Sequence, residues 1–178
     1  MWQKFSKSYP LYLELIPLFL LLITSYLAWA NYASLPDTIP THFNAQGLPD
    51  EWGSRQSIFA FPAFGAFMYL LLTAFNIWLA LVKNPKRYIN LPKKRLENLT
   101  DAQAEKLLIF LNRCLFVMKT LFQGLSIYLV YVTIEVAHGR AASLGFPFYL
   151  ILAAIIGVVI FMVWQSLRRT AVPTAGRF

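Results

Sequence analysis

The stretch LYLELIPLFLLLITSYLAWANYAS, residues 11–34, decides the fold because it is long and almost wholly apolar. Its one charged side chain, Glu14, lies near its start. About 20 apolar residues in a helix cross roughly 30 Å of hydrocarbon. Residues 57–82, 107–136 and 145–167 are apolar over similar lengths. The sequence therefore predicts an all-α integral membrane protein, with one domain over residues 1–178 and four transmembrane helices.

The composition of the 178-residue chain supports this prediction. Apolar residues make up 58% of the chain and charged residues 13%, against roughly 25% charged in a typical soluble domain. A soluble chain of this size exposes too much surface to hide so many apolar side chains. A soluble enzyme, a disordered segment and a nucleic-acid-binding protein are therefore excluded, although the net charge is +8.

The placement of the basic residues predicts the orientation in the membrane. Twelve of the 16 Lys and Arg residues lie in the N-terminal segment, the loop 83–106 or the tail 168–178. The other four are Arg55 and Arg140 on the opposite side, and Arg113 and Lys119 within the third helix. By the positive-inside rule, both termini and the loop 83–106 are cytoplasmic, and the loop 35–56 is extracytoplasmic. The basic surplus then serves topology and contact with anionic membrane lipids in a bacterial inner membrane.

The first segment also has features of a cleaved signal peptide. Lys4 and Lys7 form a basic start, and Ala28-Trp29-Ala30 resembles a cleavage site. The apolar stretch is longer than the roughly 7–15 residues of a signal peptide, however, and carries a glutamate, so we expect a retained helix.

Three further residues predict details of the helices. Pro17 and Pro62 fall inside apolar segments, where a proline removes a backbone hydrogen bond, so a kink is expected at each. Thr100 followed by Gln103 fits a capping box, which predicts that the third helix begins well before its apolar run.

The loop LPDTIPTHFNAQGLPDEWGSRQ, residues 35–56, is too long for a simple connection. An alternation over residues 38–43 indicates a short extended segment, and Asn44 to Gly47 indicates a tight turn. Ser54 is placed to cap the second helix. The rings of Phe43 and Trp52 are expected to pack on each other or to dip into the membrane surface. The sequence thus predicts a folded cap over the first two helices.

The ordered motif in this loop resembles a known family. Leu35-Pro36-Asp37, then Ile39-Pro40-Thr41-His42-Phe43-Asn44, then Gly47-x-Pro49-Asp50-x-Trp52-Gly53-Ser54 is similar to the bacterial domain of unknown function 1648, the N-terminal domain of SdpI-like immunity proteins. The resemblance implies a membrane module whose loop lies outside the cytoplasm. The similarity to SdpI-like proteins in particular implies protection against a peptide toxin. The loop 83–106 lacks the Asn…Gly-x-Arg-Thr motif usual in the C-terminal half of those proteins.

Chemically reactive side chains gather on the extracytoplasmic side. His42 and His138 are the two histidines, with carboxylates at Asp37, Asp50, Glu51 and Glu135. No pair has the spacing of metal ligands on one helix, and no nucleophile–base pair is evident, so we predict no metal, no cofactor, no catalytic residue and no enzyme activity. Asp37 and Asp50 follow prolines and are expected to fix turns, with ligand binding as the alternative.

Polar side chains within the membrane need partners. They are Glu14, Asn76, Asn112, Arg113, Lys119 and Gln123. Glu14 comes to a depth at which it could neutralise either Lys119 or Arg113. Residues 112, 119, 123 and 126 follow one stripe of the third helix, which should face the bundle interior or a partner protein.

Three functions remain compatible with the sequence. The first is a non-enzymatic SdpI-like protein that binds or senses an extracytoplasmic peptide, toxin or lipid through the loop 35–56. The second is an accessory subunit that packs against another membrane protein, or a homo-oligomer, because the fourth helix is nearly featureless. The third is a small transporter, which would need a polar path through the helices.

Overall fold

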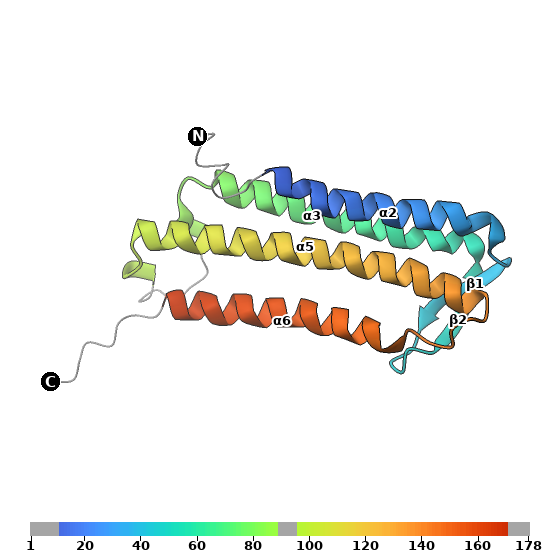
Figure 1. Ribbon diagram of the computed structural model, residues 1–178. Helices are drawn as coiled ribbons and strands as arrows, with labels where there is room; N and C mark the ends of the chain where they lie inside the picture. The colour runs from blue at the N-terminus through green and yellow to red at the C-terminus, as the bar shows by residue number, and fades with distance from the viewer. Residues whose placement is uncertain (1–10, 89–95, 171–178) are drawn as a thin grey trace.

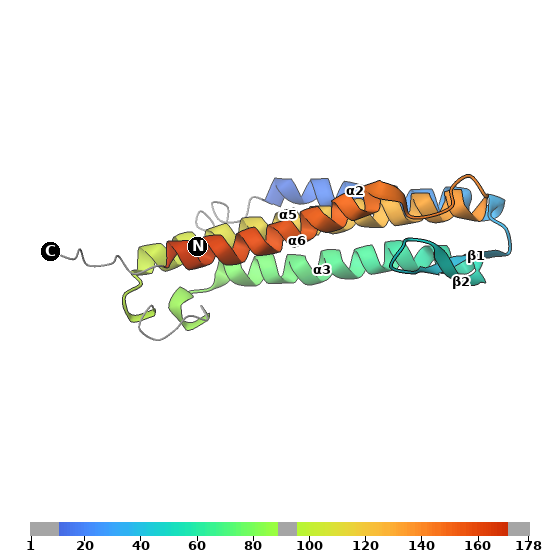
Figure 2. The same cartoon turned by 90° about the horizontal axis from the view of Figure 1, so that it is seen from below.

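The described residues form an elongated bundle of four long helices with a small hairpin at one end (Figures 1 and 2). The structure is a computed structural model and describes residues 11–88 and 96–170 of the chain. Its long helices are α2 (Leu15–Asn31), α3 (Ala60–Leu81), α5 (Asp101–Ala137) and α6 (Gly145–Arg169). Short 3-10 segments add to α2 and α3, giving four spans long and apolar enough to cross a membrane: Leu11–Ser34, Arg55–Leu81, Asp101–Ala137 and Gly145–Arg169.

Each predicted proline kink falls just after a 3-10 segment. η1 (Leu11–Glu14) precedes α2 and η3 (Arg55–Phe59) precedes α3. Pro17 and Pro62 consequently each stand third in their α-helix. Whether the helices bend at these prolines stays a prediction.

The capping box predicted at the start of the third helix is confirmed. The Gln103 backbone N–H donates to the Thr100 hydroxyl at 3.2 Å, and the Thr100 N–H donates to the Gln103 side chain at 2.9 Å. α5 therefore begins at Asp101, inside the stretch 83–106 assigned to the loop. Another part of that stretch, η4 (Pro85–Tyr88), is a short 3-10 helix.

α5 is the central helix, and it packs against each of the other three. α2 and α3 lie together on one part of its surface, and α6 lies along another (Figure 1). Most apolar side chains of α6 are exposed, with Ile155 its one buried residue. In a membrane such exposed side chains face lipid tails or another protein.

The loop between the first two helices folds into an antiparallel hairpin. Its strands are β1 (Thr38–Phe43) and β2 (Pro49–Ser54), and the pairing places Pro40 opposite Trp52. An irregularity in the register after Pro40 breaks the alternation expected from the sequence, so that Thr41 is exposed. We call the end of the bundle that carries β1 and β2 the hairpin end, and the opposite end the loop end.

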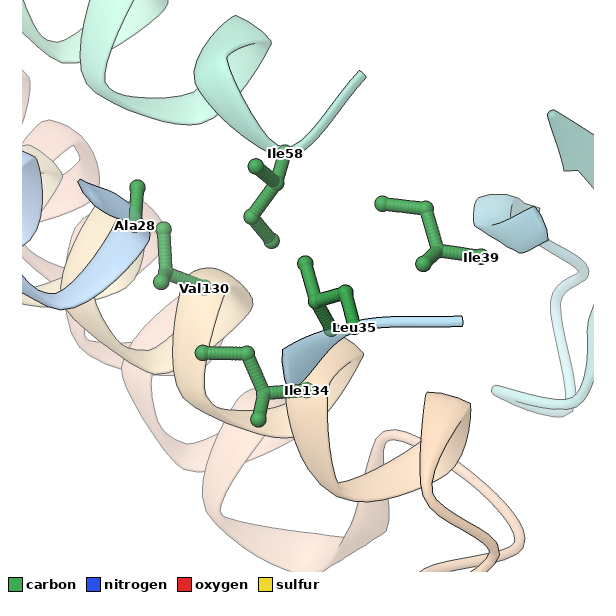
Figure 3. Packing of buried hydrophobic residues seen from close by; sticks show 6 residues of the cluster. All are labelled: Ala28, Leu35, Ile39, Ile58, Val130 and Ile134. Carbon is green, nitrogen blue, oxygen red and sulfur yellow. The ribbon is translucent and has the colours of Figure 1, made fainter. Parts of the chain in front are cut away.

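An apolar cluster joins the hairpin to the helices (Figure 3). Ile39 of β1 is fully buried and belongs to this cluster. The contributing residues come from α2, the loop, β1, η3 and α5: Ala28, Leu35, Ile39, Ile58, Val130 and Ile134. The hairpin is therefore packed onto three helices and does not extend freely from the bundle.

Candidate functional site

The turn of the hairpin is held by Asn44 and Gly47. The Asn44 side-chain oxygen accepts the backbone N–H groups of Gln46 and Leu48, each at 3.0 Å. The Gly47 N–H donates to the Asn44 carbonyl at 2.8 Å, and the φ of Gly47 is +75°. Glycine adopts this left-handed conformation without steric cost, as the sequence predicts for this position. The aspartates were expected to fix the turns, but Asn44 makes these bonds.

The tip of the hairpin is also bonded to the connection between α5 and α6. The Leu144 N–H donates to the Gly47 carbonyl at 2.8 Å, and the Tyr149 hydroxyl donates to the Ala45 carbonyl at 3.2 Å. The sequence analysis missed Tyr149, since nothing in the pattern of α6 connects it with a loop about 100 residues earlier. These two bonds hold both ends of the turn, so the cap is anchored at its tip as well as at its base.

The two aromatic rings of the motif lie in different surroundings. Phe43 is half-buried and packs against Val132, Val136 and Leu144. Trp52 pairs with Pro40 across the hairpin, and 53% of its surface is exposed. The expectation that the rings pack on each other is therefore wrong: Phe43 anchors the hairpin, and Trp52 is left on the surface.

His42 and Asp50 form an exposed pair beside Trp52. The Nδ1 atom of His42 lies 2.6 Å from Oδ1 of Asp50, and both side chains are at least 40% exposed. This hydrogen bond, together with the negative charge of Asp50, raises the pKa of His42 above its usual 6.5. The pairing therefore favours the protonated, positively charged form of His42.

The remaining motif residues fix the base of the hairpin. The Asp37 carbonyl accepts the Arg55 N–H at 3.0 Å, while the Asp37 carboxylate is exposed, 3.9 Å from the Arg55 guanidinium. Ser54 caps η3 by accepting the Gln56 N–H at 3.4 Å. A Cβ on Gly53 would come within 2.8 Å of the Thr41 side chain, so only glycine fits there without a shift.

A second polar site lies inside the bundle, between α2, α3 and α5. The Lys119 ammonium is fully buried and bonds to the Glu14 carboxylate at 2.5 Å, which selects Lys119 over Arg113 as the partner of Glu14. Lys119 also donates to the Thr73 hydroxyl at 2.9 Å, and that hydroxyl donates to Glu14 at 3.3 Å. The Tyr69 ring lies 5.3 Å from the Lys119 nitrogen. Arg113 is exposed.

Buried amides continue this polar stripe along α5. The Asn76 side chain donates to both the backbone carbonyl of Asn112, at 2.9 Å, and its side-chain oxygen. Gln123 donates to the Gly65 carbonyl at 2.9 Å, and Ser126 donates to the Phe61 carbonyl at 2.8 Å. Within residues 11–88 and 96–170, two buried amide oxygens have no hydrogen-bond partner: those of Asn76 and Gln123. The stripe predicted on the third helix thus faces the interior.

Asn76 was identified from the sequence, but the other residues on the α3 side of this network were not. Gly65, Tyr69, Thr73 and Asn76 follow one another at intervals of four, four and three residues, which places them on one face of a helix. That spacing of small and polar residues was the signal in the sequence that could have predicted the polar face of α3. It is weak in an apolar segment, because glycine and tyrosine are common in membrane helices for other reasons.

Three further ionisable groups near the hairpin end have local partners. Glu135 and Arg140 form a two-bond pair, at 2.9 and 2.8 Å. The His138 ring lies at the end of α5, with its nitrogens 2.8 Å from the Ile134 carbonyl and 3.1 Å from the Ser34 carbonyl. Among residues 11–88 and 96–170, no group of three or more His, Cys, Asp or Glu residues is arranged to hold a metal ion.

Four membrane-length helices with a hairpin packed over one end define a multi-pass membrane protein. Residues 18–66 match the family model of DUF1648, a domain of unknown function, so this part of the chain is similar to that family. This segment comprises most of α2, the hairpin and the start of α3. The chain is also 29% identical, over 134 residues, to an uncharacterized protein of Archaeoglobus fulgidus; the match covers 74% of this chain and 73% of that one. No solved structure matches.

Proposed function

We propose that this protein is a non-enzymatic, SdpI-like recognition protein of the cytoplasmic membrane, which binds an extracytoplasmic peptide or lipid through the outer face of its hairpin. The observation that supports this is the contrast between the two faces of the cap. The inner face is anchored by Ile39 and Phe43, whereas the outer face exposes Trp52 beside the His42–Asp50 pair. An exposed aromatic side chain on a rigid support is typical of a binding surface.

The orientation in this proposal follows from the distribution of basic residues. Lys86 and Gln46, exposed or half-exposed at opposite ends of the bundle, provide a matched pair for cysteine labelling. With Cys114 changed to serine, Gln46→Cys should react with a membrane-impermeant thiol reagent on intact cells. Lys86→Cys should react only after the cells are opened. The reverse pattern would overturn the orientation.

Photo-crosslinking in living cells tests the binding surface. A photoreactive phenylalanine analogue at position 52 should yield a discrete adduct, while the same analogue at position 46 on the hairpin tip should not. Asp50→Ala should abolish the adduct while leaving the amount of inserted protein unchanged. Absence of any adduct, or loss of insertion in the Asp50 variant, would show that the cap is structural only.

The accessory-subunit alternative has its own supporting observation, the exposed surface of α6. Gentle solubilisation followed by size analysis separates the two functions. Migration within a large complex of fixed stoichiometry would favour the accessory role, and migration alone or as a small homo-oligomer would favour recognition through the hairpin.

A further inference from the structure

A groove of about 290 Å³ opens at the loop end of the bundle, where α3 ends and η4 begins. One wall of the groove is apolar and aromatic. Trp78, Leu81 and Tyr88 line it, and each is roughly half exposed. The rings of Trp78 and Tyr88 meet edge to face, with their centres 5.1 Å apart.

The other wall of the groove carries two cations. Lys83 and Arg87 line it and are exposed. Within the two described stretches of the chain, neither forms an ion pair with a carboxylate. Lys86, which lies between them in sequence, is different: its ammonium is 3.1 Å from the Asp101 carboxylate. It lines a neighbouring hollow, which Lys83 also borders, and does not line the groove. Among the described residues, the groove therefore combines two cations that have no carboxylate partner with an apolar aromatic wall.

The groove lies at the end of the apolar span Arg55–Leu81. The span ends at Leu81, and Lys83 follows two residues later, so the groove has its apolar wall at the level of the hydrocarbon and its cations at the level of the headgroups. Aromatic side chains favour this boundary. An Arg guanidinium can form two parallel hydrogen bonds to a phosphate, and a Lys ammonium adds a compact charge.

We propose that this groove is a binding site for an anionic phospholipid, with the phosphate between Lys83 and Arg87 and an acyl chain along Trp78 and Leu81. Charge complementarity selects an anionic headgroup over a zwitterionic one. The apolar wall selects a lipid over free phosphate, since inorganic phosphate gains nothing from contact with Trp78. The site lies at the opposite end of the bundle from the hairpin, so the inference is independent of the proposed recognition function.

Native mass spectrometry of the full-length protein provides the test. Delipidated protein in a nonionic detergent is mixed with equal amounts of phosphatidylglycerol and phosphatidylcholine, and the bound lipids are counted. The unmodified protein should retain phosphatidylglycerol in preference. Lys83→Gln and Arg87→Gln should each weaken this preference about fivefold, the factor expected for one basic residue near an anionic lipid. Lys86→Gln removes the same charge from the same segment and should leave it unchanged.

Two further measurements keep the proposal falsifiable. Arg87→Lys keeps the charge and should retain more of the preference than Arg87→Gln, provided that both variants elute as the unmodified protein does. Equal losses in all three glutamine variants would show diffuse attraction and overturn the site, as would no loss in any of them. Displacement of the bound lipid by millimolar inorganic phosphate would assign the groove to free phosphate and overturn the lipid as its occupant.

Discussion

Replacing Glu14 should destabilise the protein strongly, because Lys119 would lose its carboxylate while remaining buried. Two unit charges 2.5 Å apart attract by roughly 7 kcal/mol at an effective dielectric constant of about 20. Desolvation of both groups opposes this attraction, and removing one partner of such a buried pair costs about 3–5 kcal/mol. For a chain of this length, that loss lowers the melting temperature by roughly 6–20 °C.

The chain contains its own reporter for this experiment. Cys114 is the one cysteine in the sequence and is 7% exposed, so a dye that fluoresces on reaction with thiols reports unfolding of the detergent-solubilised protein. Glu14→Gln and Lys119→Met should each lower the melting temperature by the amount given above. Arg113→Gln, which removes an exposed charge on the same helix as Lys119, should change stability by less than about 0.5 kcal/mol.

Double variants separate the ion pair from local packing. Combining Glu14→Gln with Lys119→Met removes both charges and should cost less than the sum of the single changes. The charge-swapped variant, Glu14→Lys with Lys119→Glu, should recover part of the stability. The reasoning fails if Glu14→Gln is as mild as Arg113→Gln, or if the swapped variant is less stable than both single variants.

Three further outcomes are expected at the hairpin end. In an NMR titration, Asp50→Asn should lower the pKa of His42 toward 6.5, and an unchanged His42 titration would contradict this. Because the pKa of His42 is raised in the folded state, the pair stabilises the hairpin fully below about pH 6.5. This stabilisation is lost as the pH rises through the raised pKa. In thermal unfolding, Gly47→Ala should lower the stability more than Gly139→Ala does. Both glycines have positive φ, but only Gly47 has a side-chain atom within 2.9 Å of the added Cβ. Equal losses of stability would leave backbone strain alone as the cause. Ile39→Ala should cost about 2–5 kcal/mol, and a loss below 1 kcal/mol would mean that the cluster beneath the hairpin contributes little.

The helices were predictable from sequence because membrane crossing imposes a length and an apolar composition that few other structures share. The capping box at Thr100 was predictable for a similar reason, since its geometry depends on residues three apart. The hairpin was only partly predictable: the turn at Asn44 to Gly47 has local causes, but β2 carries Pro49, Asp50 and Gly53, which are poor strand formers. Its pairing with β1 and its support by the helices override that local preference.

The polar contacts were likewise only partly predictable from the sequence. Glu14 and Lys119 could be expected to pair because charges inside a membrane need partners, and the structure decides between Lys119 and Arg113 by the direction in which each faces. The anchoring of the hairpin tip by Tyr149 could not be foreseen. It depends on how α6 is placed relative to α5, which long-range packing determines.

The cluster beneath the hairpin has a consequence for the order in which the chain assembles. Ala28, Leu35, Ile39 and Ile58 belong to the DUF1648 segment, but Val130 and Ile134, which complete the cluster, are synthesised some 70 residues after it. The hairpin therefore cannot complete the burial of its apolar side chains while only the first two helices are in the membrane. It packs fully only after α5 has been inserted, and its tip is hydrogen-bonded only after α6 has been inserted. The segment that matches the family model thus lacks two residues of the cluster, and a truncated chain that ends before α5 would display an incompletely packed cap.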